Sequence, residues 1–179
     1  AAPVTSTLPL LFIFLKFCLQ IYSNFLILRP LNTNVIMLLG IASDHAGFEM
    51  KEALKKYLAS QGYDVKDFGT HSSESMDYPD VAHPLAESVE KGEVDLGIAL
   101  CGSGNGISMT LNKHQGVRAA LCWNEELAAL ARQHNDANVL SLPARFIPVD
   151  LAERIVRKFL DSSFEGGRHQ RRVEKIPCR

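Results

Sequence analysis

The 179-residue chain has too little positive charge for a nucleic-acid-binding protein and lacks the cysteine spacing of a disulfide or zinc framework. Its 19 Lys and Arg residues are balanced by 20 Asp and Glu residues, for a net charge of -1, so no large basic surface is expected. The four cysteines include no C-x-x-C pair and no partner spacing typical of zinc ligands. We therefore expect a reducing, cytoplasmic location. An apolar content of 46% argues against a disordered chain.

Acidic side chains are missing from residues 1–36, where Lys16 and Arg29 are the charged groups. In the range 8–28, 16 of 21 residues are apolar, close to the roughly 20 residues that span a bilayer. Lys16 opposes insertion, because a Lys at the centre of a spanning helix costs about 3 kcal/mol. Two interpretations stay open, a non-native or removed segment and a targeting or anchoring segment that reaches a membrane only if it is retained and inserts. Residues 37–179 are expected to form the functional domain, with a basic C-terminal tail.

From residue 37 onward, short apolar runs alternate with amphipathic helices. The continuous run 37–42 is typical of a strand that is buried on both faces of a parallel sheet. Further strands are predicted at 65–68, 95–100, 117–122 and 138–142. Helices are predicted at 48–61, at 79–91, from the loop after the third strand toward 112, at 125–133 and at 150–160. Five successive strand–helix units predict a Rossmann-like three-layer α/β/α sandwich around a five-stranded parallel sheet.

A glycine-rich loop, CGSGNG at 101–106, follows the third predicted strand. Ligands of open parallel sheets bind at the carboxyl ends of the strands, where this loop lies. Its glycines allow a tight turn at a helix N-terminus, where unpaired N–H groups attract an anion. The spacing is neither the dinucleotide fingerprint nor a P-loop, which disfavours a nicotinamide or ATP site. The alternative is that the glycines only permit a tight turn between strand and helix.

Cys101 is the first residue of the glycine-rich loop, directly after that strand. A helix N-terminus favours the thiolate form of a cysteine. A thiolate beside several N–H donors suits the removal of a proton from a carbon next to a carbonyl, because the donors can hold the resulting enediolate. The alternative for a lone cysteine is a small buried apolar residue, which is the role we expect for Cys122.

Five strings of residues resemble the type B ribose-5-phosphate isomerases, in that family's order and over nearly all of the range 37–172. They are SDHAGF at 43–48, DYP at 77–79, CGSGNGI at 101–107, RQHNDANVL at 132–140 and EGGRHQRR at 165–172. The resemblance implies a reversible conversion between ribose 5-phosphate and ribulose 5-phosphate in the pentose phosphate pathway, without a metal or an organic cofactor.

The resemblance also implies roles for particular residues. Cys101 matches the catalytic base of the family. One branch of the family carries a glutamate just after the glycine-rich loop, and Ile107 stands there instead, which favours the cysteine branch. Ser103 matches an assisting hydroxyl, and Asp44 and His134 match groups that handle the sugar hydroxyls and ring opening.

The remaining residues implied by the resemblance bind the substrate. Backbone N–H groups of the loop would hold the developing oxyanion, while histidine and arginine side chains would contact the phosphate and the ends of the sugar. The predicted substrate-binding residues are His45, Tyr78, Gly102, Gly104, Asn105, Gly106, Asn135, Arg118, Arg168 and Arg172.

The basic tail indicates an assembly. Arg168 and Arg172 are four residues apart, so a helix would place both guanidinium groups on one face, where they could bind a phosphate. A tail beyond the last helix cannot easily reach the cleft of its own chain. We therefore expect a homodimer, with a tetramer as the alternative, whose active sites are shared between subunits, as the family also suggests.

Three other functions stay open. The same chemistry could act on a six-carbon sugar phosphate, allose 6-phosphate or galactose 6-phosphate. A non-catalytic phosphosugar-binding module would keep the loop and the tail but would not need Cys101. A thiol-based phosphatase or redox enzyme would use Cys101 as a nucleophile, although no arginine closes the loop before Arg118.

Overall fold

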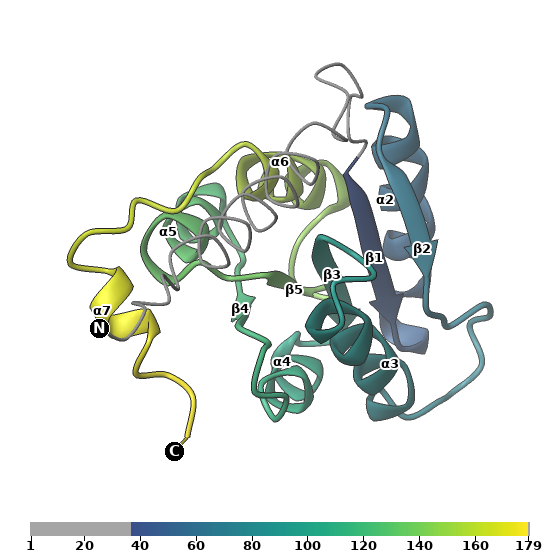
Figure 1. Ribbon diagram of the computed structural model, residues 1–179. Helices are drawn as coiled ribbons and strands as arrows, with labels where there is room; N and C mark the ends of the chain where they lie inside the picture. Colours follow the sequence, from purple (N-terminus) through teal and green to yellow (C-terminus); the bar gives the residue numbers. More distant parts are fainter. Residues whose placement is uncertain (1–36, 179) are drawn as a thin grey trace, which may run out of the picture. The chain divides into compact units, whose positions relative to one another are not determined.

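A computed structural model describes residues 37–178 and shows a five-stranded sheet in which all strands are parallel (Figure 1). The strands are β1 (Leu38–Ser43), β2 (Asp64–Asp67), β3 (Leu96–Cys101), β4 (Ala119–Leu121) and β5 (Val139–Pro143). The helices are η1 (His45–Gly47), α2 (Phe48–Ser60), α3 (Pro79–Glu90), α4 (Asn105–Leu111), α5 (Glu125–Asn135), α6 (Val149–Leu160) and α7 (Gln170–Val173). The expected anchoring or targeting role of the apolar N-terminal segment lies outside the described residues.

The strand order is β2-β1-β3-β5-β4, with helices on both faces of the sheet. Helices α2, α5 and α6 pack on one face, and α3 and α4 pack together on the other (Figure 1). The predicted three-layer α/β/α sandwich is therefore confirmed. Among residues 37–178, no helix combines the length and the apolar character that a membrane crossing needs.

The composition of the central strands explains the two layers. Every residue of β3 is buried, and large side chains such as Ile98 and Leu100 point toward α2 and α6. Small residues such as Ala42 and Ala99 face the other layer, where Leu85 of α3 packs against them. Cys101 also belongs to that second layer, so the strand brings its side chain to the side of the sheet that carries α3 and α4.

The edge strand β4 is shorter than the predicted strand at 117–122. Its outer backbone groups find partners in a side chain: Asn112 donates to the Ala119 carbonyl and accepts the Ala119 N–H, each at 2.9 Å. Before the strand, the Arg118 N–H donates to the side-chain oxygen of Asn138 at 2.7 Å. Amide side chains thus satisfy backbone groups that an edge strand would otherwise leave open.

Candidate active site

A cleft of about 410 Å³ opens at the carboxyl ends of β1 and β3. The chain leaves these neighbouring strands toward opposite sides of the sheet, because β2 lies beyond β1 and β4 lies beyond β3 and β5. Such a switch point leaves a crevice between the two outgoing loops. The cleft is lined by Asp44, His45, Ala46, Tyr78, Cys101, Gly102, Ser103, Gly106, Arg145 and Phe146.

The Cys101 side chain lies on the wall of this cleft, although it is only 4% exposed. Its Sγ accepts a hydrogen bond from the Gly104 N–H at 3.1 Å. The sulfur therefore faces both the cleft and the backbone of the glycine-rich loop. Cys122 differs, because it is 1% exposed and burial raises the pKa of its thiol to about 12. Cys122 is thus a buried thiol, as expected from the sequence.

Two glycines of the loop are required by space and by backbone conformation. Gly104 has a φ of 74°, a left-handed conformation that is unfavourable for other residues. A Cβ there would also collide with the Leu121 side chain and come within 3.1 Å of the Leu142 carbonyl carbon. At Gly106, a Cβ would lie 2.6 Å from the Tyr78 ring. The missing side chains let the loop pack beside Leu121 of β4 and Leu142 of β5 and let the Tyr78 ring lie against the end of the loop, where α4 begins.

Asp44 and His45 enter the cleft from the loop after β1. The buried Asp44 carboxylate accepts the N–H groups of Ala46 at 2.9 Å and Gly47 at 3.1 Å, so it caps η1. Asp44 therefore has a structural role as a helix cap, and its side chain also lines the cleft. The His45 Nδ1 accepts the Met76 N–H at 3.3 Å, which places the proton of the neutral ring on Nε2.

Arg145 and Phe146 line the cleft although the sequence interpretation did not select them. They belong to the turn after β5, which is tied to the glycine-rich loop because the Arg145 N–H donates to the Gly102 carbonyl at 3.0 Å. The guanidinium is exposed and brings a positive charge to the mouth of the cleft. The signal that could have found Arg145 is its place at a strand end, but only the order β3-β5 makes that strand a neighbour of Cys101.

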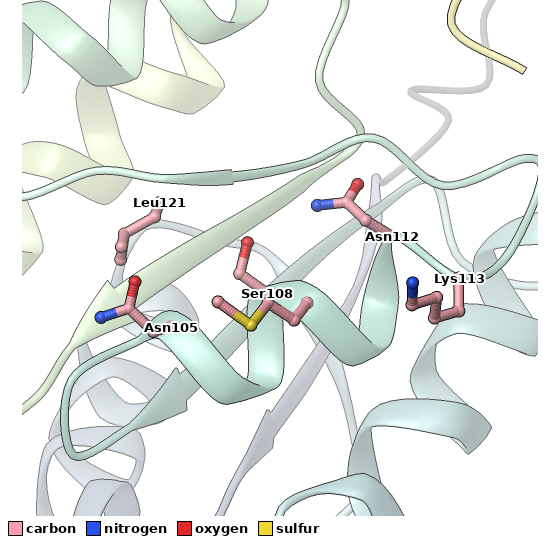
Figure 2. Close-up of a pocket in the computed structure, with 6 residues that line it drawn as sticks. Asn105, Ser108, Asn112, Lys113 and Leu121 are labelled. Atoms are coloured by element: carbon pink, nitrogen blue, oxygen red, sulfur yellow. The ribbon is translucent and has the colours of Figure 1, made fainter.

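Asn105 contributes to a different hollow. Its side chain lies beside Leu121, along the exposed side of α4, in a depression of about 450 Å³ (Figure 2). Ser103 stays in the main cleft, and its hydroxyl accepts the Asn105 N–H at 3.4 Å. The structure thus places Ser103, but not the side chain of Asn105, among the cleft-lining groups.

Five other predicted site residues lie at the opposite edge of the sheet. They are Arg118, His134, Asn135, Arg168 and Arg172. Arg118 precedes β4, and its guanidinium pairs with Asp136 at 2.9 Å, just beyond α5. Val139, at the amino end of β5, pairs with Ala119 of β4, next to Arg118. Pro143, at the carboxyl end of β5, pairs with Cys101 and lies four residues, or roughly 13 Å, further along the strand. One copy of the chain therefore does not bring these five residues to Cys101.

The segment that carries Arg168 and Arg172 is attached to the end of α5. The Glu165 N–H donates to the Gln133 carbonyl at 3.0 Å. Arg168 lies in the turn before α7, and Arg172 lies within this four-residue helix. The two arginines thus do not share one continuous helix, because Gly166 and Gly167 have positive φ angles and keep the helix from starting earlier.

Comparison with known proteins gives a consistent result. A family model described as Ribose/Galactose Isomerase matches residues 39–176. The chain is 48% identical over 133 residues to ribose-5-phosphate isomerase B of Escherichia coli (strain K12). This match covers 74% of this chain and 89% of that relative. It is 43% identical over 141 residues to the putative sugar phosphate isomerase YwlF of Bacillus subtilis (strain 168), covering 78% of this chain and 95% of the relative.

Solved structures agree. Ribose-5-phosphate isomerase B of Clostridium thermocellum has a TM-score of 0.78 at 50% identity, covering 78% of this chain and 95% of that one. The enzyme of Mycoplasma genitalium with bound ribulose-5-phosphate has a TM-score of 0.76 at 46% identity, covering 78% and 93%. The fold, its cleft and these comparisons together define a Rossmann-like isomerase. The chain belongs to the Ribose/Galactose Isomerase family, and the resemblance carried by the five residue strings is confirmed.

Proposed function

We propose that the protein interconverts ribose 5-phosphate and ribulose 5-phosphate through an enediolate, with Cys101 as the general base. The observation that carries the proposal is the position of the Cys101 sulfur, which lines the cleft and accepts the Gly104 N–H. Relatives named ribose-5-phosphate isomerase B, one of them with ribulose-5-phosphate bound, support the choice of a five-carbon substrate. The same relatives support a place in pentose phosphate metabolism.

The proposed proton transfer begins on the open-chain aldose. The Cys101 thiolate takes the proton from carbon 2, the electron pair of that C–H bond forms the C1–C2 double bond, and O1 takes up the negative charge. N–H groups of the loop 102–106 would stabilise this oxyanion. A proton then moves from the C2 hydroxyl to O1, for which Ser103 and Asp44 are the proposed relays, since both line the cleft. The thiol finally returns its proton to carbon 1, so the steps need neither an oxidant nor an organic cofactor.

The charged groups at the mouth of the cleft fit the other end of a sugar phosphate. The exposed Arg145 guanidinium can form a bidentate pair with phosphate oxygens, and the Nε2 proton of His45 can donate to them. Arg145 therefore joins His45 among the proposed phosphate contacts. Tyr78, which lies over Gly106, limits the space along the sugar.

The site is proposed to be completed by a second copy of the chain. His134, Asn135, Arg168 and Arg172 lie at the amino edge of the sheet and cannot reach Cys101 in the same copy. In a homodimer with two-fold symmetry, each subunit would contribute these groups to the cleft of its partner, which gives two equivalent sites.

Mixing two variants, each deficient in the turnover of ribose 5-phosphate, tests this sharing. Cys101→Ala and His134→Ala chains, unfolded and refolded together, would form mixed dimers with one site that is intact in both residues. We expect about a quarter of the wild-type activity to return, because half of the dimers are mixed and each has one intact site. A mixture that stays as inactive as its components would contradict shared sites. An untreated mixture, whose dimers have not exchanged, is the matched control.

The substrate is tested with ribose 5-phosphate and allose 6-phosphate side by side, using the full chain in deuterated water. The proposal predicts turnover of ribose 5-phosphate and deuterium at carbon 1 of the ketose. Faster turnover of allose 6-phosphate would favour a six-carbon substrate. Exchange with neither sugar would contradict isomerase activity on these substrates.

A further inference from the structure

Two histidine rings lie face to face at the end of α5. The rings of His134 and His169 are parallel within 4°, and their centroids are 4.2 Å apart. His169 is 6% exposed, whereas His134 is half-buried. Glu165 lies beside both rings, with its Oε2 3.8 Å from His134 Nε2 and 3.9 Å from His169 Nε2. A buried ring therefore forms the support against which the more exposed His134 rests.

His169 also holds a neighbouring arginine. The Arg168 Nε–H donates to His169 Nε2 at 3.3 Å. The His169 carbonyl accepts the N–H groups of Arg172 and Val173, each at 2.9 Å, so the residue starts the α7 turn as well. One buried imidazole thus contacts two side chains that the proposed function assigns to the substrate, His134 on its face and Arg168 on its edge.

We propose that His169 is a positioning residue, which fixes the plane of the His134 ring by stacking and aims the Arg168 guanidinium by accepting its Nε–H. This inference rests on the proposed function and on the roles that the family resemblance implies, ring opening for His134 and substrate binding for Arg168. His169 itself is not proposed to touch the sugar, because it is buried behind the other two side chains.

The charges around His169 support this assignment. Burial lowers the pKa of His169, the nearby His134, Arg168 and Arg172 lower it further, and Glu165 opposes them in part. The ring therefore stays neutral at pH values where a free histidine begins to take up a proton. A neutral ring keeps the Nε2 lone pair that Arg168 needs, whereas a protonated ring would repel the guanidinium.

A metal site is the main alternative use of these side chains. His134, Glu165 and His169 offer ligand atoms that all lie within 4.8 Å of one another. However, the two imidazole planes are parallel, so their in-plane lone pairs run side by side and do not converge on one point. The His169 Nε2 is already engaged by a guanidinium, whose positive charge opposes a bound cation. The geometry therefore favours positioning over metal binding.

Two substitutions separate the two contacts of His169. His169→Phe keeps a flat ring against His134 but removes the acceptor for Arg168. We expect KM for ribose 5-phosphate and ribulose 5-phosphate to rise roughly three- to tenfold, the equivalent of one lost hydrogen bond, with kcat within about twofold of the wild type. His169→Gln keeps an acceptor close to the Nε2 position but removes the stacked ring. We therefore expect this variant to act by misplacing the His134 ring.

The consequence of a misplaced His134 differs between the two reaction directions. Ribose 5-phosphate closes to a ring through its C4 hydroxyl, whereas ribulose 5-phosphate stays open because its C5 oxygen is phosphorylated. If ring opening is no longer catalysed, the aldose rate stops rising with enzyme concentration, since uncatalysed opening becomes limiting. We expect this levelling for His169→Gln, while its rate with the ketose stays proportional to enzyme concentration. His169→Phe should stay proportional in both directions.

Gln170→Ala is the matched control, because within residues 37–178 this neighbouring exposed side chain bonds to Glu174 of its own turn and to no other side chain. Circular dichroism establishes that each variant is folded, and either folded variant alone tests its own contact. The inference is overturned if both variants behave alike or match the wild type. It is also overturned if the wild-type protein binds one equivalent of Zn²⁺ and both variants lose that binding. A wild-type chain that does not isomerise ribose 5-phosphate would instead refute the proposed function.

Discussion

Replacing Gly104 by alanine tests whether the shape of the glycine-rich loop is dictated by its surroundings. The φ of 74° costs a residue with a Cβ about 1–2 kcal/mol. The added methyl group would also meet the Leu121 side chain and the Leu142 backbone, and forcing an extra carbon into a packed site costs about 1–3 kcal/mol. We therefore expect Gly104→Ala to lower the free energy of unfolding by about 2–5 kcal/mol.

Gly92→Ala is the matched control for this experiment. Gly92 has a similar φ of 67°, but a Cβ there would have no atom within 4 Å, so only the backbone cost of about 1–2 kcal/mol remains. Urea denaturation of both variants gives the two losses, and their difference measures the collision at Gly104. Because the Gly104 N–H donates to Cys101, Gly104→Ala should also lose isomerase activity while Gly92→Ala keeps it. Equal losses of stability would refute the reasoning.

Other predictions concern a buried ion pair and the cysteines. Asp67→Asn should lower the free energy of unfolding by about 3 kcal/mol in urea denaturation, because it leaves the fully buried Lys51 amine without its main partner, 2.6 Å away. Burial alone would raise the pKa of Asp67, but hydrogen bonds from Lys51, Lys55 and the Gly69 N–H outweigh it and hold the pKa below its ordinary value. Stability measured from pH 6 to pH 3 should therefore fall more steeply below about pH 4 in the wild type than in Asp67→Asn. Iodoacetamide should modify Cys101 and leave Cys122 intact in mass spectrometry of the folded protein, and saturating sugar phosphate should protect Cys101.

The layered fold could be predicted from the sequence because each element carries its own signal. The apolar run that became β3 is buried throughout, as its composition requires. Its carboxyl end brings Cys101 and the glycine-rich loop to the expected edge of the sheet. The strand order could not be predicted, since hydrophobic periodicity reports how deeply a strand is buried and not which strand lies beside it. That order places the loop after β5 against Cys101, which explains why Arg145 was missed.

From the sequence, only the tail arginines were expected to act in a partner's site, whereas the structure also places Arg118, His134 and Asn135 away from the cleft of their own chain. Residue types and motif order identify groups suited to a sugar phosphate, but they do not say which end of a strand each group occupies. His134 and Asn135 end α5 on the amino side of the sheet, far from the cleft of the same chain. Contacts between individual side chains could not be predicted either. The stacking of His169 on His134 depends on a turn in which the His169 N–H donates to the Gly166 carbonyl.

The most direct test of the account measures binding and proton exchange in Cys101→Ala. The variant should bind ribose 5-phosphate in isothermal calorimetry with a Kd within about twofold of the wild-type value, since the sulfur supplies little of the binding energy. Its turnover and its incorporation of solvent deuterium at carbon 1 should fall by about a hundredfold to ten-thousandfold, the usual contribution of a general base. A variant that binds and still exchanges the proton at the wild-type rate would contradict the role of Cys101 as the base.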